Sequence, residues 1–116
     1  MSKLHLFRHT KAATEASDPP FDRLVSGQPK GETINVFESA DGKLFSGIWR
    51  ATVGAWRVKY NETEYCHITK GRARLIEKGG ATIDVNVGDG FVIEAGFVGV
   101  WQVIEDMEKH YVILLP

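Results

Sequence analysis

The sequence predicts an all-β domain, a jelly-roll barrel or sandwich of short antiparallel strands. From Ile34 onward, apolar runs and glycine-rich turns alternate about every 8–12 residues, which is typical of these folds. No segment after Glu32 shows the apolar repeat of a helix. A double-sheet jelly roll is the usual way for such a chain to limit its exposed strand edges.

The chain has 116 residues, which suits a single domain. Residues 1–32 hold three of the four prolines and no sustained strand pattern, whereas residues 33–116 carry the strands. We therefore expect an N-terminal arm that packs on the barrel or on a partner subunit, with a poorly ordered tail as the alternative.

The strands follow in order from the apolar runs and the turns between them. Asp41-Gly42 and Gly79-Gly80 are hairpin turn signals. We expect strands at residues 34–39, 44–52, 55–60, 64–70, 72–78, 81–87, 88–96, 98–105 and 110–115.

Alternation along the strands predicts which side chains face the barrel lumen. In residues 55–60, Trp56, Val58 and Tyr60 share the inner face, and Arg57 and Lys59 turn outward. The same rule places further side chains in the lumen, namely Trp101 and Val103 from one strand and Ile83, Val85 and Val87 from another. The aromatic residues Trp56, Tyr60 and Trp101 either form the walls of a small-molecule site or simply fill the core.

Composition and charge exclude several classes of protein. Fourteen basic and fifteen acidic residues give a net charge of −1, without a basic run, so we expect no nucleic-acid or membrane partner. No apolar stretch approaches the roughly 20 residues of a membrane span, and the apolar core of the first ten residues is too short for a signal peptide. The single cysteine, Cys66, excludes an internal disulfide and favours a cytoplasmic location.

Two motifs resemble those of a known family. The run "EYCHITKG" from Glu64 to Gly71 resembles the first cupin motif, and "GDGFVIEAG" from Gly88 to Gly96 resembles the second. With "SGIW", "AGFVGVW" and "KHYVIL", these runs make residues 33–116 similar to the small cupins of the DUF861 (cupin_3) subfamily. That group includes ureidoglycine aminohydrolases and the ethanolamine-utilisation cupin. The resemblance implies an RmlC-like double-stranded β-helix, a conical barrel whose lumen binds a ligand or a metal.

Many cupins bind a divalent metal through three histidines and a glutamate. In this sequence the histidine positions of the motifs hold Val58, Tyr60 and Gly99, and only Glu64 remains. Because lone carboxylates hold transition metals poorly, we predict no tightly bound metal and no cofactor. A rearranged metal site is the alternative; its available donors would be Glu62, Cys66, His67 and His110.

A carboxylate that faces an apolar lumen must be solvated, paired or protonated. We therefore assign Glu64 as a general acid, a general base or a ligand anchor, and Tyr60 as its catalytic partner across the lumen. Lys109, at the start of the last expected strand and near the barrel mouth, is the first choice for a cation beside Glu64. The ligand-binding candidates are Trp56, Val58, Cys66, Gly99, Trp101 and Lys109, with Gly99 leaving space where a histidine would stand.

The sequence favours a cupin that binds a small metabolite in its lumen, and it leaves open whether the protein is an enzyme. One alternative is a non-catalytic dimeric scaffold or regulatory cupin. The other is a metal-dependent enzyme similar to the aminohydrolases with a rearranged site. The small cupins usually pair through sheet edges, so we expect a homodimer in each case.

Overall fold

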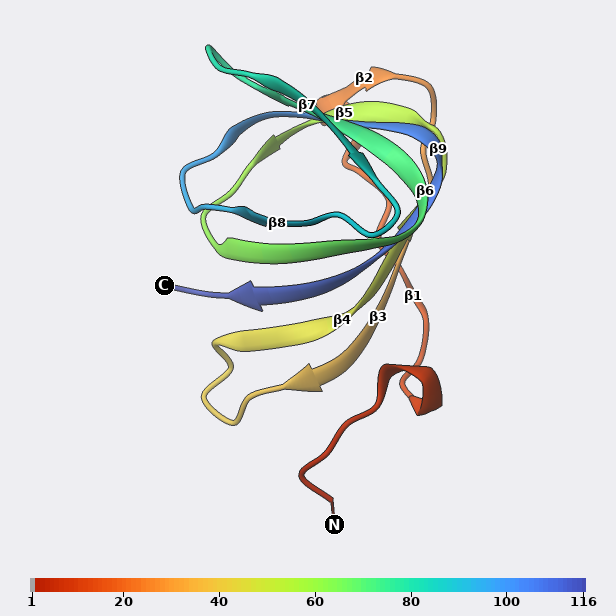
Figure 1. The fold of residues 1–116 in the computed structure, drawn as a ribbon, viewed down its shortest axis with the longest axis vertical. Helices are drawn as coiled ribbons and strands as arrows, with labels where there is room; N and C mark the ends of the chain where they lie inside the picture. Colours follow the sequence, from red (N-terminus) through yellow and green to blue (C-terminus); the bar gives the residue numbers. More distant parts are fainter. Residues whose placement is uncertain (1) are drawn as a thin grey trace.

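The computed structural model describes residues 2–116 and is almost entirely β-structure (Figure 1). Within this range there are nine strands and two short 3-10 helices, but no α-helix. The elements are η1 (Phe7–His9), β1 (Glu15–Ala16), η2 (Phe21–Arg23), β2 (Leu24–Ser26), β3 (Gly31–Glu38), β4 (Leu44–Ala51), β5 (Gly54–Lys59), β6 (Thr63–Glu77), β7 (Thr82–Asn86), β8 (Gly90–Ile93) and β9 (Val98–Leu114). The predicted all-β class is confirmed.

Two long antiparallel strands, β6 and β9, form the spine of the sheet. The other edge of β9 pairs first with β5 and then with β4, and the other edge of β6 pairs with β8 and then β7. Figure 1 shows both long strands bending so that the sheet curls around an interior. The shorter strands are thereby arranged around one lumen.

The sequence prediction divided each long strand into two. Gly71 has a φ of +70°, and a Cβ atom at this position would meet the carbonyl oxygen of Asp106. The register between β6 and β9 shifts on both sides of Gly71, which is the signature of a β-bulge. Because a bulge bends a strand without ending it, glycine here marks a corner of the barrel, although in the sequence it resembles a turn.

The N-terminal arm packs on the barrel through short strands. β1 pairs with β3, and β2 pairs with β5. Between them, η2 brings Pro20 and Arg23 to a cavity of the barrel. The arm therefore extends the sheet and contributes to the wall of the interior.

The core differs from the prediction at one strand. Trp101, Ile68, Val103 and Cys66 are the largest fully buried side chains. Of the three residues predicted to face inward here, only Val85 in β7 is buried, while Ile83 in β7 and Val87, just after it, are 56% and 61% exposed. β7 is an edge strand that pairs only with β6 and projects beyond the barrel wall, so its alternation does not guarantee burial (Figure 1).

The part of the chain that the structure describes contains no helix long and apolar enough to cross a membrane.

Candidate functional site

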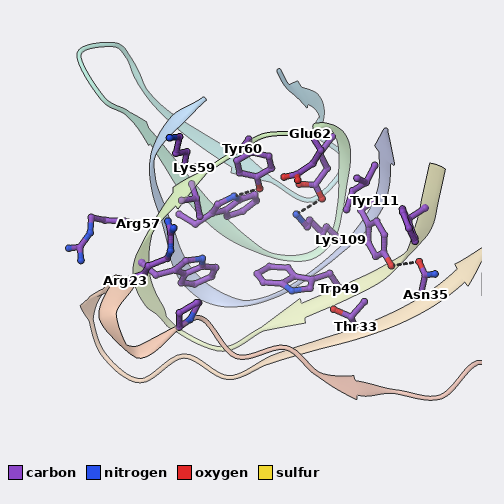
Figure 2. Close-up of a pocket in the computed structure, with 17 residues that line it drawn as sticks. Arg23, Thr33, Asn35, Trp49, Arg57, Lys59, Tyr60, Glu62, Lys109 and Tyr111 are labelled. Carbon is purple, nitrogen blue, oxygen red and sulfur yellow. Dashed lines mark hydrogen bonds and ion pairs between the residues drawn. The ribbon is translucent and has the colours of Figure 1, made fainter. Parts of the chain in front are cut away.

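A cavity of about 610 Å³ lies within the curl of the sheet, between β3, β4, β5, β9 and the arm (Figure 2). This volume lies within the range of roughly 300–1,000 Å³ that is common for small-molecule sites. Aromatic side chains make up much of its wall, and they include all three tryptophans of the chain. The aromatic residues are Phe45, Trp49, Trp56, Tyr60, Trp101 and Tyr111.

An ion pair lies at the floor of this cavity. Lys109 Nζ, from the middle of β9, donates to Glu64 Oε2, from the start of β6, over 2.9 Å. Each side chain is only 6% exposed. Alternation turns both side chains to the inner face. They are not register partners, because Glu64 lies opposite Ile113 and Lys109 opposite Ile68, so the long Lys109 side chain reaches past Cys66 to meet Glu64. The only buried carboxylate of the cavity lining thus has its own cation.

Further contacts hold the Lys109 ammonium in place. Its Nζ lies 4.8 Å from the ring centroid of Trp49 and 4.6 Å from that of Trp101, in cation–π geometry. It also lies 3.5 Å from Cys66 Sγ. Burial has the largest single effect and lowers the pKa of Lys109, but the charge and hydrogen bond of Glu64, together with Cys66 and Tyr60, outweigh it, so the net pKa lies above the ordinary lysine value. The side chain is therefore an ammonium at neutral pH.

Tyr60 faces the same interior and is fixed through its hydroxyl group. Its oxygen accepts a hydrogen bond of 3.0 Å from Trp101 Nε1. Burial is the main cause of a raised Tyr60 pKa, with Lys109 acting in the opposite direction. Tyr60 is therefore a neutral phenol whose hydroxyl group can donate a hydrogen bond to a ligand. It is poorly suited to act as a general base, because it would first have to lose its own proton.

The structure brings most of the predicted ligand-binding residues together. Trp56, Val58 and Trp101 line the cavity with Tyr60, Glu64 and Lys109. The roles assigned to these residues remain predictions. The expected partner of Glu64 is present, although Lys109 lies at the floor of the cavity and not near its mouth. The sequence analysis placed Lys109 at a strand start, whereas β9 already begins at Val98.

Two predicted site residues lie away from the cavity surface. Cys66 is fully buried behind the floor, and burial raises the pKa of its thiol to about 12, so it is neutral and unreactive as a nucleophile. The expectation that Gly99 leaves free space in the lumen is wrong, because Gly99 does not line the cavity and no space is free beside it. A Cβ atom there would meet the backbone carbonyl of Ile76, so Gly99 permits close contact of β9 with β6.

The sequence analysis missed part of the wall. Trp49 and Phe45 both lie on the inner face of β4. They are four residues apart, so alternation along the strand could have identified both as lining residues. Tyr111 donates to Asn35 Oδ1 over 2.7 Å, and burial, followed by the charge of Glu64, raises its pKa to about 12. The contribution of Arg23 had no sequence signal, because it depends on where the arm packs.

The residues present do not fit the divalent metal that the cupin resemblance implies. Two of the motif positions, Val58 and Tyr60, lie on the cavity wall without imidazoles, and the ammonium of Lys109 already pairs with Glu64. A metal ion beside Glu64 would have to displace or closely approach this ammonium, at a high electrostatic cost. Within residues 2–116 no three His, Cys, Asp or Glu side chains cluster closely enough to hold an ion. The rearranged site from Glu62, Cys66, His67 and His110 is therefore not assembled.

Comparison with known proteins confirms the predicted cupin fold. The family model of the EutQ-like cupin domain (Cupin_3) matches residues 38–111, more than half of the chain. No curated protein matches the sequence.

Solved structures give the same picture. A DUF861 family protein of unknown function from Pseudomonas syringae has a TM-score of 0.80 and 24% identity over 89% of this chain. The EutQ protein of Clostridium difficile has a TM-score of 0.65 and 17% identity over 74%. Ectoine synthase from P. lautus has a TM-score of 0.65 and 15% identity over 74%. The chain spans 45%, 63% and 64% of these three proteins, and at such identities the likeness concerns the fold alone.

Proposed function

The chain belongs to the EutQ-like cupin domain family, and from this premise we propose that it binds a small organic metabolite in its lumen without a metal ion. The observation that carries the proposal is the buried pair of Glu64 and Lys109 at the floor of an open aromatic cavity. Burying such a pair is unfavourable unless the geometry and surrounding contacts are good, so it is weak evidence for a purely structural role.

The arrangement provides three kinds of contact for a ligand. The tryptophan faces offer apolar surface, the Tyr60 hydroxyl is a fixed hydrogen-bond donor, and the carboxylate of Glu64 has lone pairs beyond the one that Lys109 uses. The hydrogen bond of 2.9 Å from Lys109 Nζ fixes the Glu64 carboxylate in position, which suits it as an anchor or a hydrogen-bond acceptor. Whether turnover follows binding is a separate property, and the proposal concerns binding alone.

A matched pair of variants tests this proposal. Glu64→Gln/Lys109→Met removes both charges together, so neither is left buried without a partner, and Glu108→Gln removes a charge from the opposite face of the sheet. The three tryptophans, all in the cavity wall, allow intrinsic fluorescence to report binding of a panel of small carboxylates, amides and amines. Native mass spectrometry gives the stoichiometry.

We expect at least one compound to bind wild type and Glu108→Gln at one molecule per chain. The double variant should bind it at least about tenfold more weakly, as expected when a buried polar contact is lost. Saturable binding to none of the panel, or equal binding by the double variant, would overturn the proposal.

We also propose that the protein forms a homodimer. Val92, Tyr65 and Val112 occupy adjacent register positions on β8, β6 and β9, and they are 63%, 44% and 37% exposed on the outer face. A second copy would cover this apolar row, and light scattering at micromolar concentration tests it: a dimer that Tyr65→Glu dissociates supports the pairing, and a strict monomer refutes it.

The free, buried Cys66 also supports our expectation of a cytoplasmic location.

A further inference from the structure

The cavity lining is asymmetric in charge. Arg23, Arg57 and Lys59 line one end, and Glu62 lines another (Figure 2). Figure 2 shows the three cations on the side of the cavity away from Lys109 and Tyr111, with the Arg57 side chain directed outward, while Glu62 lies on the side of Lys109 and Tyr111. Since Lys109 compensates Glu64 on the floor, the cationic end has the largest uncompensated charge of the lining.

No carboxylate neutralises this end. Within residues 2–116, none of the three cations forms an ion pair with an acidic side chain at 4.0 Å or less. Asp22, the acidic neighbour of Arg23 in η2, offers Arg57 only its backbone carbonyl, at 2.6 Å. That hydrogen bond holds the guanidinium of Arg57 close to the turn that carries Arg23.

The cationic end is formed from two separate parts of the chain. Arg57 and Lys59 lie on β5, and Arg23 comes from the arm, whose strand β2 pairs with β5 directly after η2. All three are exposed. A cleft with low-dielectric walls and charges of one sign at one end concentrates ligands of the opposite sign, and guanidinium groups match carboxylate geometry.

We propose that the metabolite of this cavity is an organic anion, with its apolar body against the tryptophans and its carboxylate or similar group at Arg23, Arg57 and Lys59. This inference rests on the proposed small-molecule function and adds the ligand class and the residues that select it. The pair of Glu64 and Lys109 then contacts the far end of the ligand, and the three cations at the other end make the cavity selective for a negatively charged ligand.

Three probes of the same shape test the charge preference, namely benzoate, benzamide and benzylammonium. Tryptophan fluorescence and calorimetry measure their binding to the full chain. We expect benzoate to bind at least about tenfold more tightly than benzamide, since three partly solvated charges each contribute on the order of two- to fivefold. Benzylammonium should bind most weakly, and about 0.5 M salt should weaken benzoate binding but not benzamide binding.

The variant Arg23→Gln/Arg57→Gln/Lys59→Gln should reduce benzoate binding about tenfold and leave benzamide binding unchanged. A control, Lys3→Gln/Lys43→Gln/Lys78→Gln, removes the same charge from exposed positions outside the cavity lining and should retain benzoate affinity. Equal losses in both variants would overturn the inference, because net charge alone would then explain the effect.

The outcomes separate this inference from the proposed function. If benzamide or benzylammonium binds as tightly as benzoate, the anion preference is wrong while the cavity still binds small molecules. If none of the three probes binds, the anion inference is overturned, and the compound panel decides the proposed function independently.

Discussion

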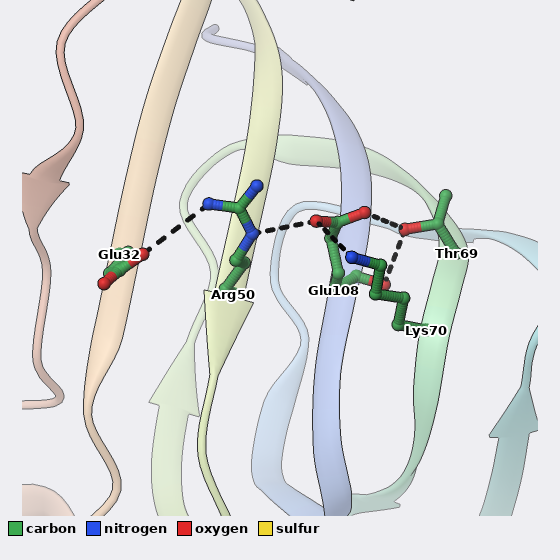
Figure 3. Close-up of polar contacts among 5 residues, drawn as sticks. All are labelled: Glu32, Arg50, Thr69, Lys70 and Glu108. Carbon is green, nitrogen blue, oxygen red and sulfur yellow. Dashed lines mark hydrogen bonds and ion pairs between the residues drawn. The ribbon is translucent and has the colours of Figure 1, made fainter. Parts of the chain in front are cut away.

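Consecutive residues of β9 belong to two polar clusters, one on each face of the sheet. Lys109 points into the cavity and meets Glu64, whereas Glu108 points outward and meets several partners (Figure 3). The Glu108 carboxylate accepts from Arg50 Nε at 2.8 Å and from Thr69 Oγ1 at 2.7 Å. Arg50 also lies 3.6 Å from Glu32.

The difference between the clusters lies in solvent access. The inner pair is 6% exposed on both sides. In the outer network Glu108 is 12% exposed, but Arg50 and Glu32 are 42% and 53% exposed. Water and salt can replace a lost contact in the outer network, but they have little access to the inner pair. The outer cluster can therefore tolerate change, and the inner one holds two charges that depend on each other.

The largest expected effect comes from Lys109→Met. It leaves the Glu64 carboxylate buried without a cation, which should lower the free energy of unfolding by about 3–5 kcal/mol. Glu64→Gln/Lys109→Met should recover most of this loss, because no unpaired charge remains. Urea unfolding at pH 7 measures both, and a double variant as unstable as the single one would contradict the coupling.

A smaller effect should follow alkaline pH. The Lys109 pKa lies above its ordinary 10.5, and burial raises the pKa of Cys66 from 9.0 to about 12. Both groups therefore hold their protons more tightly in the folded state, so their stabilisation is complete below about pH 9 and declines as the pH rises. Unfolding curves between about pH 8 and pH 11 should show this decline. Cys66→Ala should flatten it near pH 9–10, and a pH-independent wild type would refute it.

Glu108→Gln should give the smallest of the three effects, a loss of about 1 kcal/mol that mostly disappears at high salt. Burial acts to raise the pKa of Glu108, but Thr69, Arg50 and Lys70 lower it more, so its stabilisation exists above the ordinary carboxyl pKa and is lost as the pH falls through the lowered one. Acid titration of unfolding compares this variant with wild type. A loss as large as that of Lys109→Met would remove the distinction between the two faces.

Alternation along a strand was enough to predict several residues of the cavity from sequence. It placed Trp56, Tyr60, Glu64 and Trp101 on the inner face, where the structure has them. It also turned Arg57 and Lys59 outward, and both side chains are exposed where they border the cavity.

The rest depends on distant pairings that local patterns do not encode. The depth of Lys109 follows from the full length of β9, which the sequence analysis divided into two strands. The space at Gly99 is taken by the carbonyl of Ile76, a residue of another strand. The position of Arg23 requires the arm to pair with β5.

The place of β9 in the chain has a consequence for biosynthesis. β4, β5 and β6 each pair with β9, yet β9 is synthesised after all three. Until it emerges from the ribosome, these strands have unpaired backbone edges, which readily recruit other chains. Folding of the nascent protein therefore depends on a late, long-range step in which β9 closes the barrel. If the protein is synthesised faster than β9 pairs with the earlier strands, incomplete barrels should aggregate.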